Sequence, residues 1–219
     1  MRSILYIAFF VWFSGYTTFR AEHFVGEWSD VIQEDESQRT TLRGKQLVTA
    51  LSEKFRTMKN YGVSFSVETG NQQIKGNYVV EGNAYNLNIG AAEVFCDGAL
   101  RYEIDKQRKE ITLDKVDKSN RNILSNPIRA FDFLDSDYSS RLLWEHDGKA
   151  AICLMPQKGG KTGTIVVTLV VESLRPTELQ YDFDGERIRV KIEKVAPLTT
   201  QIARFDRANY PNYEMIDFR

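Results

Sequence analysis

Apolar and polar residues alternate with a period of two from residue 63 to residue 114, and this pattern constrains the fold more than any other feature of the chain. Because successive side chains of a strand point to opposite faces, such alternation predicts half-buried β-strands. The first of them is Val63–Glu68, and Gly70-Asn71 and Gly82-Asn83 are typical of tight hairpin turns. The segment therefore predicts six strands joined by short turns, an antiparallel meander.

Five further strands are predicted in the second half of the chain, and helices precede each half. Leu47, Leu51 and Phe55 recur at helical spacing, which predicts one amphipathic helix at about residues 41–58. Pro127 opens a short apolar segment that indicates one or two short helices. The later strands are predicted at Arg141–Glu145, Ala150–Met155, Gly163–Glu172, Glu178–Asp182 and Arg187–Lys194.

About eleven strands at near-regular spacing predict a mainly β protein built on one highly curved sheet. One face of each strand is polar and can face water, whereas the apolar face must be covered. The helix at 41–58 and the segment near Pro127 are the available covers, and two short elements do not fill so wide a sheet. We therefore expect an apolar cavity between the sheet and its helices.

The first residues of the chain have the pattern of an export signal. Arg2 precedes an apolar stretch of about ten residues, and a small polar exit follows it. A membrane anchor is the alternative, but a span needs roughly 20 apolar residues. The prediction is a signal peptide at 1–21, a flexible polar leader at 22–40 and a single domain at 41–219.

Charge and cysteine content exclude some classes of partner. The chain has 30 acidic and 29 basic residues and a net charge of −1. Such a balance gives no attraction to nucleic acid or to an anionic membrane surface, so no nucleic-acid partner is expected. Cys96 and Cys153 each lie in an apolar strand-like segment, and two buried free thiols are predicted in place of a disulfide framework.

No motif of the sequence indicates catalysis, a metal or a cofactor. Gly159–Gly163 resembles the end of a phosphate-binding loop, but Met155 replaces its first glycine and a strand follows it, which favours a hairpin loop. Asp182–Gly185 resembles part of a calcium loop without the later ligands. His23 and His146 lack metal-ligand spacing. We therefore predict a protein that is not an enzyme and needs no cofactor or metal.

The order and spacing of several short motifs add to the strand pattern. These motifs are Phe65–Val67, Gly76–Leu87, Cys96–Asp105, Asn126-Pro127, Leu154–Pro156, Asp182–Gly185 and Tyr210–Arg219. Taken together over about residues 41–219, they resemble the LolA family, the periplasmic carriers of outer-membrane lipoproteins. The ending is similar to that of family members from Bacteroidetes-like bacteria.

The resemblance implies an unclosed, eleven-stranded antiparallel β-barrel whose helices form a lid over an apolar cavity. It implies a monomeric periplasmic carrier of lipid-modified proteins, which takes their acyl chains from an inner-membrane lipoprotein-releasing transporter to an outer-membrane receptor. Tyr85 matches a family Phe and is a candidate for the cavity rim. Glu81 stands where proteobacterial members have an Arg that takes part in lid closure, so no role is carried over to it.

Strand parity, combined with the resemblance, predicts which side chains contact the acyl chains. The inward faces assigned in this way are almost wholly apolar, which disfavours the hypothesis of an envelope hydrolase, since an active site needs polar residues. The alternative to a carrier is a lipid- or lipoprotein-binding sensor of envelope stress. A register error of one residue would exchange the two faces of a strand. The predicted contacts are Phe65, Tyr78, Val80, Tyr85, Leu87, Leu100 and Tyr102 on the concave face, and Phe131 and Phe133 on the lid.

Overall fold

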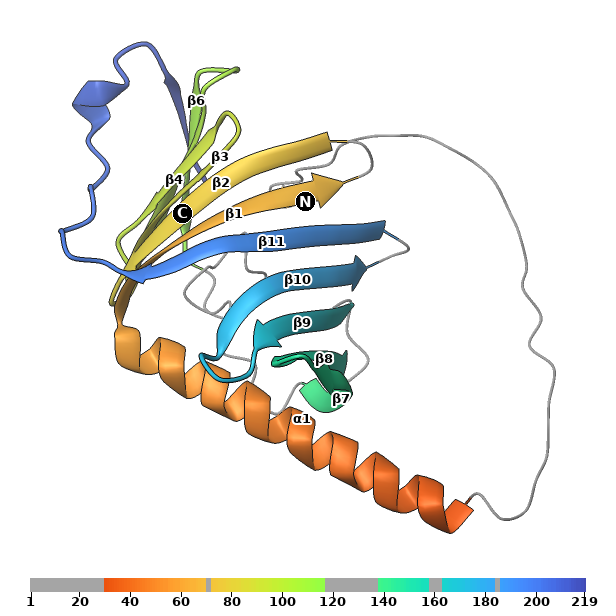
Figure 1. Cartoon of the computed structure of the whole chain (residues 1–219). Helices are drawn as coiled ribbons and strands as arrows, with labels where there is room; N and C mark the ends of the chain where they lie inside the picture. The colour runs from red at the N-terminus through yellow and green to blue at the C-terminus, as the bar shows by residue number, and fades with distance from the viewer. Residues whose placement is uncertain (1–29, 70–71, 117–137, 158–162, 184–185) are drawn as a thin grey trace, which may run out of the picture.

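A computed structural model describes residues 30–69, 72–116, 138–157, 163–183 and 186–219. In these ranges one long helix lies across one side of a twelve-stranded, strongly curved sheet (Figure 1). The elements are α1 (Asp30–Met58), β1 (Asn60–Thr69), β2 (Gln72–Glu81), β3 (Ala84–Ile89), β4 (Ala92–Cys96), β5 (Leu100–Asp105), β6 (Glu110–Lys115), β7 (Tyr138–His146), β8 (Lys149–Pro156), β9 (Thr164–Val170), β10 (Arg175–Phe183), β11 (Glu186–Pro197), the short 3₁₀-helix η2 (Arg207–Asn209) and β12 (Glu214–Asp217).

The sheet consists of two antiparallel meanders joined at the centre. Its strand order is β12-β6-β5-β4-β3-β2-β1-β11-β10-β9-β8-β7, so β1 pairs with β11 and links the two halves. The outermost strands, β12 and β7, are at opposite ends of this order, which means that the sheet is not closed. All neighbours are antiparallel except β12, which runs parallel to β6. The predicted fold class, a mainly β, unclosed antiparallel sheet with a helical cover, is confirmed.

Helix α1 begins earlier than the sequence pattern predicts. It starts at Asp30, inside the segment predicted as a flexible leader, and not near residue 41. The side chains of Glu36–Arg39 are exposed, so these turns have no apolar stripe and give no periodic signal. The leader prediction is therefore wrong from residue 30 onward, while residues 22–29 lie outside the described ranges. The short helices predicted near Pro127 also lie outside them.

The two faces of the sheet are distinguished by α1. We call the face that packs with α1 the inner face and the opposite one the outer face. Leu47, Leu51 and Phe55 of the helix belong to the same buried cluster as inner-face residues of β1–β4 and β8–β11. The helix itself contacts mainly the edge strand β7 (Figure 1). Within the described ranges, α1 is thus the one long helix that packs on a face to which eight strands contribute.

Gly44 allows this contact to be close. A Cβ atom at this position would lie 2.7 Å from the backbone N of Leu142 and 2.9 Å from the carbonyl C of Arg141. The strand opposite is irregular here, because the pairing of β7 with β8 shifts between Leu142 and Trp144. The preceding residue, Arg43, forms a two-pronged ion pair with Glu145, with N–O distances of 2.6 and 2.8 Å.

The C-terminal segment covers the far end of the outer face. Phe205 stacks on Tyr102 of β5 with ring centroids 4.1 Å apart, and Tyr210 stacks on Phe205. Beneath these rings Ile104 and Ile111 are fully buried. The chain then adds β12 to the edge of β6, a strand that the sequence analysis leaves within the tail. The tail therefore forms a second, smaller apolar cluster on the side opposite to α1.

Candidate ligand-binding face

Five of the predicted contacts meet on the inner face. They come from β1, β2 and β3, and each is between 1% and 3% exposed. Cross-strand partners share a face, and the pairs Val80↔Tyr85 and Tyr78↔Leu87 join β2 to β3. The ring of Phe65 lies over Gly76, where a Cβ would come within 2.6 Å of Cζ. These residues are Phe65, Tyr78, Val80, Tyr85 and Leu87.

Two predicted contacts lie on the wrong face. Tyr102 pairs with Phe95 and stacks on Phe205, so it belongs to the outer cluster, and Leu100, two residues earlier, shares its face. The prediction assumed that the apolar side of every strand faces inward. On β5 this assumption fails because the C-terminal segment covers the outer side and provides an apolar environment there. Phe131 and Phe133 lie outside the described residues.

The inner side of β5 carries an ion pair. Arg101 pairs with Cys96 across the strands and thus continues the inner face, and its Nη1 lies 2.8 Å from Oε2 of Glu103. Both side chains are largely buried, at 15% and 7% exposure. Burial raises the pKa of Glu103 above its ordinary value, and Arg101 opposes this shift. The sequence predicts an almost wholly apolar inner face, and this prediction is wrong at β5, where a buried ion pair lies.

Tyrosine hydroxyls add a second polar feature to this face. Tyr78 is 2% exposed, and its hydroxyl has no hydrogen-bond partner among the residues that the structure describes. Burial raises its pKa well above the ordinary value, and the neighbouring phenols of Tyr61 and Tyr181 raise it further. Burial also raises the pKa of Tyr85, to about 12. All these phenols are therefore uncharged at neutral pH.

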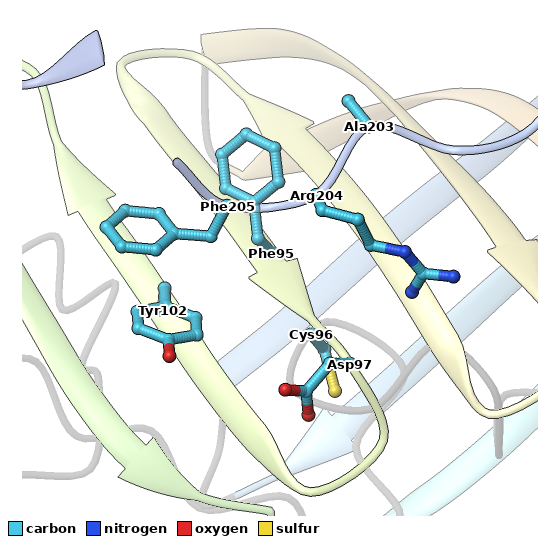
Figure 2. A pocket seen from close by; sticks show the side chains of 7 residues that line it. All are labelled: Phe95, Cys96, Asp97, Tyr102, Ala203, Arg204 and Phe205. Atoms are coloured by element: carbon cyan, nitrogen blue, oxygen red, sulfur yellow. The ribbon is translucent and has the colours of Figure 1, made fainter. Parts of the chain in front are cut away.

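A cavity of about 250 Å³ lies on the outer face, beneath the C-terminal segment (Figure 2). Arg204 at its edge bonds to Glu81, with Nη2 2.7 Å from Oε2. The carboxylate of Asp97 accepts backbone N–H bonds from Ala99 and Leu100 and so closes the β4–β5 turn. Glu81 thus binds the C-terminal segment through Arg204. The cavity is lined by Phe95, Cys96, Asp97, Tyr102, Ala203, Arg204 and Phe205.

Both cysteines are free and buried, as predicted. Burial raises the pKa of each thiol, so the reactive thiolate is scarce at neutral pH. We expect the native protein to react with Ellman's reagent at pH 7 far more slowly than a free thiol, and the denatured protein to titrate two thiols at once. Cys153→Ser should leave one slow thiol. Rapid reaction of Cys96, the inner-face thiol that remains in Cys153→Ser, would show that the inner face opens readily.

The described ranges contain no group of three or more His, Cys, Asp or Glu side chains placed to hold a metal ion. Within the same ranges, no helix has the length and apolar character needed to span a membrane.

Comparison with solved structures finds proteins of similar architecture at low identity. An uncharacterized conserved protein from Thermus thermophilus has a TM-score of 0.49 and 7% identity, over 78% of this chain and 98% of that one. A LolA superfamily protein from Nitrosomonas europaea has a TM-score of 0.41 and 10% identity, over 72% and 94%. The Pseudomonas aeruginosa MucA/MucB complex has a TM-score of 0.39 and 17% identity, over 70% and 56%.

No protein-family model and no curated protein matches the sequence. A LolA-type protein is thus among the solved structures that the chain resembles, as the sequence motifs predict. Similarity of this degree does not identify a function.

Proposed function

We propose that the protein is a periplasmic carrier of lipid-modified proteins and that its inner face binds their acyl chains. The observation that carries this proposal is the continuous apolar inner face, to which β1–β4 and β8–β11 contribute and which α1 covers. Burying an acyl chain gains about 0.8 kcal/mol per CH₂, so a surface of this kind suits a hydrocarbon ligand.

The contacts of α1 with the sheet are those expected of a helix that can move away from it. It contacts mainly β7, at the edge of the sheet, and inserts Leu47, Leu51 and Phe55 toward the inner face. An entering acyl chain would replace those side chains and preserve apolar contacts with the sheet. The ion pair of Arg43 with Glu145 is about one third exposed, and pairs of that kind contribute little to stability. Displacement of the helix would break this pair and the bond from Lys54 Nζ to the carbonyl oxygen of Ser173, which are both exposed.

The remaining steps of the proposal come from the sequence. Residues 1–21 would direct export and be removed, and the domain that begins with α1 at Asp30 would form the carrier. The cargo would come from an inner-membrane lipoprotein-releasing transporter and pass to an outer-membrane receptor. A chain without a catalytic role and without a cofactor suffices for this task, because transfer requires only binding and release.

The test uses protein purified from the periplasm and two neighbouring valines on β2. Native and lipid mass spectrometry should find acyl-bearing lipoprotein or lipid on the wild type, which should also extract lipoprotein from inner-membrane vesicles. Val80→Thr places a hydroxyl on the inner face, and we expect about tenfold weaker lipid binding, since an unpaired hydroxyl in an apolar site costs about 1–3 kcal/mol. Val79→Thr, on the outer side of the same strand, is the matched control.

Each outcome of this test points to one function. Loss of lipid with Val80→Thr and retention with Val79→Thr would support the carrier. Equal loss in both variants would mean that the inner face is not the binding surface. A wild type that is empty and extracts nothing would exclude the carrier function. Bound lipid without extraction of lipoprotein would favour the sensor of envelope stress instead.

A further inference from the structure

The hydroxyl of Tyr78 is the most conspicuous polar group on the inner face. Its ring is held between two aromatic neighbours, with centroids 6.3 Å from Tyr61 and 6.0 Å from Phe65. The side chain is 2% exposed, and no described residue accepts a hydrogen bond from it. A buried donor without an acceptor destabilises the empty protein. Phenylalanine would fill the same space without that cost.

Curvature of the sheet brings other phenols near this hydroxyl. Tyr78 is on β2 and Tyr181 on β10, separated in the strand order by β1 and β11, yet the phenol of Tyr181 raises the pKa of Tyr78. Tyr61, on the neighbouring β1, interacts with Tyr78 in the same way. Three phenols from three strands therefore belong to, or pack against, the same apolar cluster of the inner face.

The chemistry of this region selects the ligand group that fits it. Phenols whose ionisation is suppressed by burial are neutral donors, so their best partner is a neutral acceptor such as a carbonyl oxygen. A free carboxylate would bring a charge into an apolar site, and Arg101, the inner-face cation of β5, is already paired with Glu103. An ether oxygen is a weaker acceptor than a carbonyl.

We infer that the Tyr78 hydroxyl is the polar anchor of the acyl site and donates a hydrogen bond to the ester carbonyl of a bound lipid. This inference rests on the proposed function and specifies its substrate class: lipids with ester-linked acyl chains, in preference to ether lipids and free fatty acids. The same ester chemistry occurs in the diacylglyceryl group of lipoproteins and in membrane phospholipids.

The experiment compares three synthetic probes with identical C16 chains on the mature, lipid-free protein. The probes are a dipalmitoyl-glyceryl lipopeptide, its dihexadecyl ether analogue and dipalmitoyl phosphatidylglycerol. We expect the wild type to bind the ester lipopeptide about tenfold more tightly than the ether, a factor equal to about 1.4 kcal/mol and within the range of one hydrogen bond. Tyr78→Phe should bind both lipopeptides with the affinity of the ether.

A second readout separates the anchor from a purely structural role. Since Tyr78→Phe removes an unpartnered donor, the melting temperature of the empty variant should rise by a few degrees. Tyr213→Phe removes a phenol from the outer cluster and should retain the wild-type ester preference. A variant that is less stable and keeps the preference would overturn the inference.

The probes also distinguish this inference from the proposed function. If the wild type binds the lipids without preference for the ester, the anchor is wrong and the carrier stands. If phosphatidylglycerol binds as tightly as the lipopeptide and Tyr78→Phe removes the ester preference, the anchor stands and lipoprotein is not the specific cargo. If the wild type binds none of the probes, both proposals fail.

Discussion

Replacing Arg101 by alanine is expected to lower the free energy of unfolding by about 3–5 kcal/mol at pH 7, because it leaves the carboxylate of Glu103 without its partner in the interior. The two side chains are 2.8 Å apart and mostly shielded from water. Breaking a buried pair from one side costs far more than breaking an exposed pair, since the remaining charge is not solvated. Urea unfolding of the wild type and the variant measures the difference.

The pH dependence of this loss provides an internal check. Burial already raises the pKa of Glu103 despite Arg101, and neighbouring Asp114 and Asp105 add to the shift. A carboxyl whose folded pKa exceeds its unfolded value, about 4.3, contributes stability below that value and loses it as pH rises through the folded pKa. Without Arg101 the folded pKa should rise further. The variant should therefore recover part of its stability near pH 4, where Glu103 is protonated.

Two control variants show whether charge or packing is responsible. Arg101→Met combined with Glu103→Met replaces both charges by apolar chains, and it should be close to the wild type in stability or above it. Arg187→Ala removes an exposed ion pair with Asp182 and should have little effect. If Arg101→Ala were as mild as Arg187→Ala, water would have to reach the pair, and the inner face at β5 would be open.

The strand pattern was predictable because one local rule governs it. Alternation at 63–114 and the glycine turns between the segments locate β1–β6, and the inner faces of β1–β3 follow from the same parity. That parity brings Phe65, Tyr78 and Leu87 to one surface, as predicted. Alternation marks the apolar side of a strand, and for these three strands the apolar side is the inner one.

The face of β5 was not predictable from parity, because it depends on residues more than 90 positions away. Tyr102 and Ile104 are apolar and lie on the outer face, where Phe205 and Tyr210 of the C-terminal segment cover them. Arg101 and Glu103 are polar and lie inward. A periodic pattern shows which side of a strand is apolar, but it does not show whether α1 or the C-terminal segment packs on that side. The same argument explains why the ion pair, the most unusual feature of the inner face, had no signal in the sequence.

Helix and strand ends without an apolar stripe were missed for a related reason. The first turns of α1 are exposed at Glu36–Arg39, so helical periodicity begins only where the helix meets the sheet. Strand β12 has four residues, three of them exposed, and its position depends on pairing with β6. Neither segment has local hydrophobic patterning. The first turns of α1 continue a helix that packs on the sheet further along, and β12 is held by pairing with β6.

Gly44→Val is expected to lower the free energy of unfolding by about 3 kcal/mol, the upper part of the range for overpacked sites. Its Cβ would lie 2.7 Å from the backbone N of Leu142, and a strand backbone cannot rotate away as a side chain can. Helix propensity acts in the opposite direction, since valine is a better helix former than glycine by a few tenths of a kcal/mol. A net loss must therefore come from the contact of α1 with β7.

Lys45→Val is the matched control, because Lys45 is the next residue of α1 and is exposed. It should leave the unfolding free energy nearly unchanged, whereas Gly44→Val should also increase the fluorescence of an apolar dye, since lifting α1 off β7 uncovers the inner face. Under the proposed function the lifted helix should further speed lipid uptake, because part of the displacement has already occurred. A stable Gly44→Val protein with wild-type dye binding would mean that α1 does not rest on β7 at this glycine, and the inner face would need another cover.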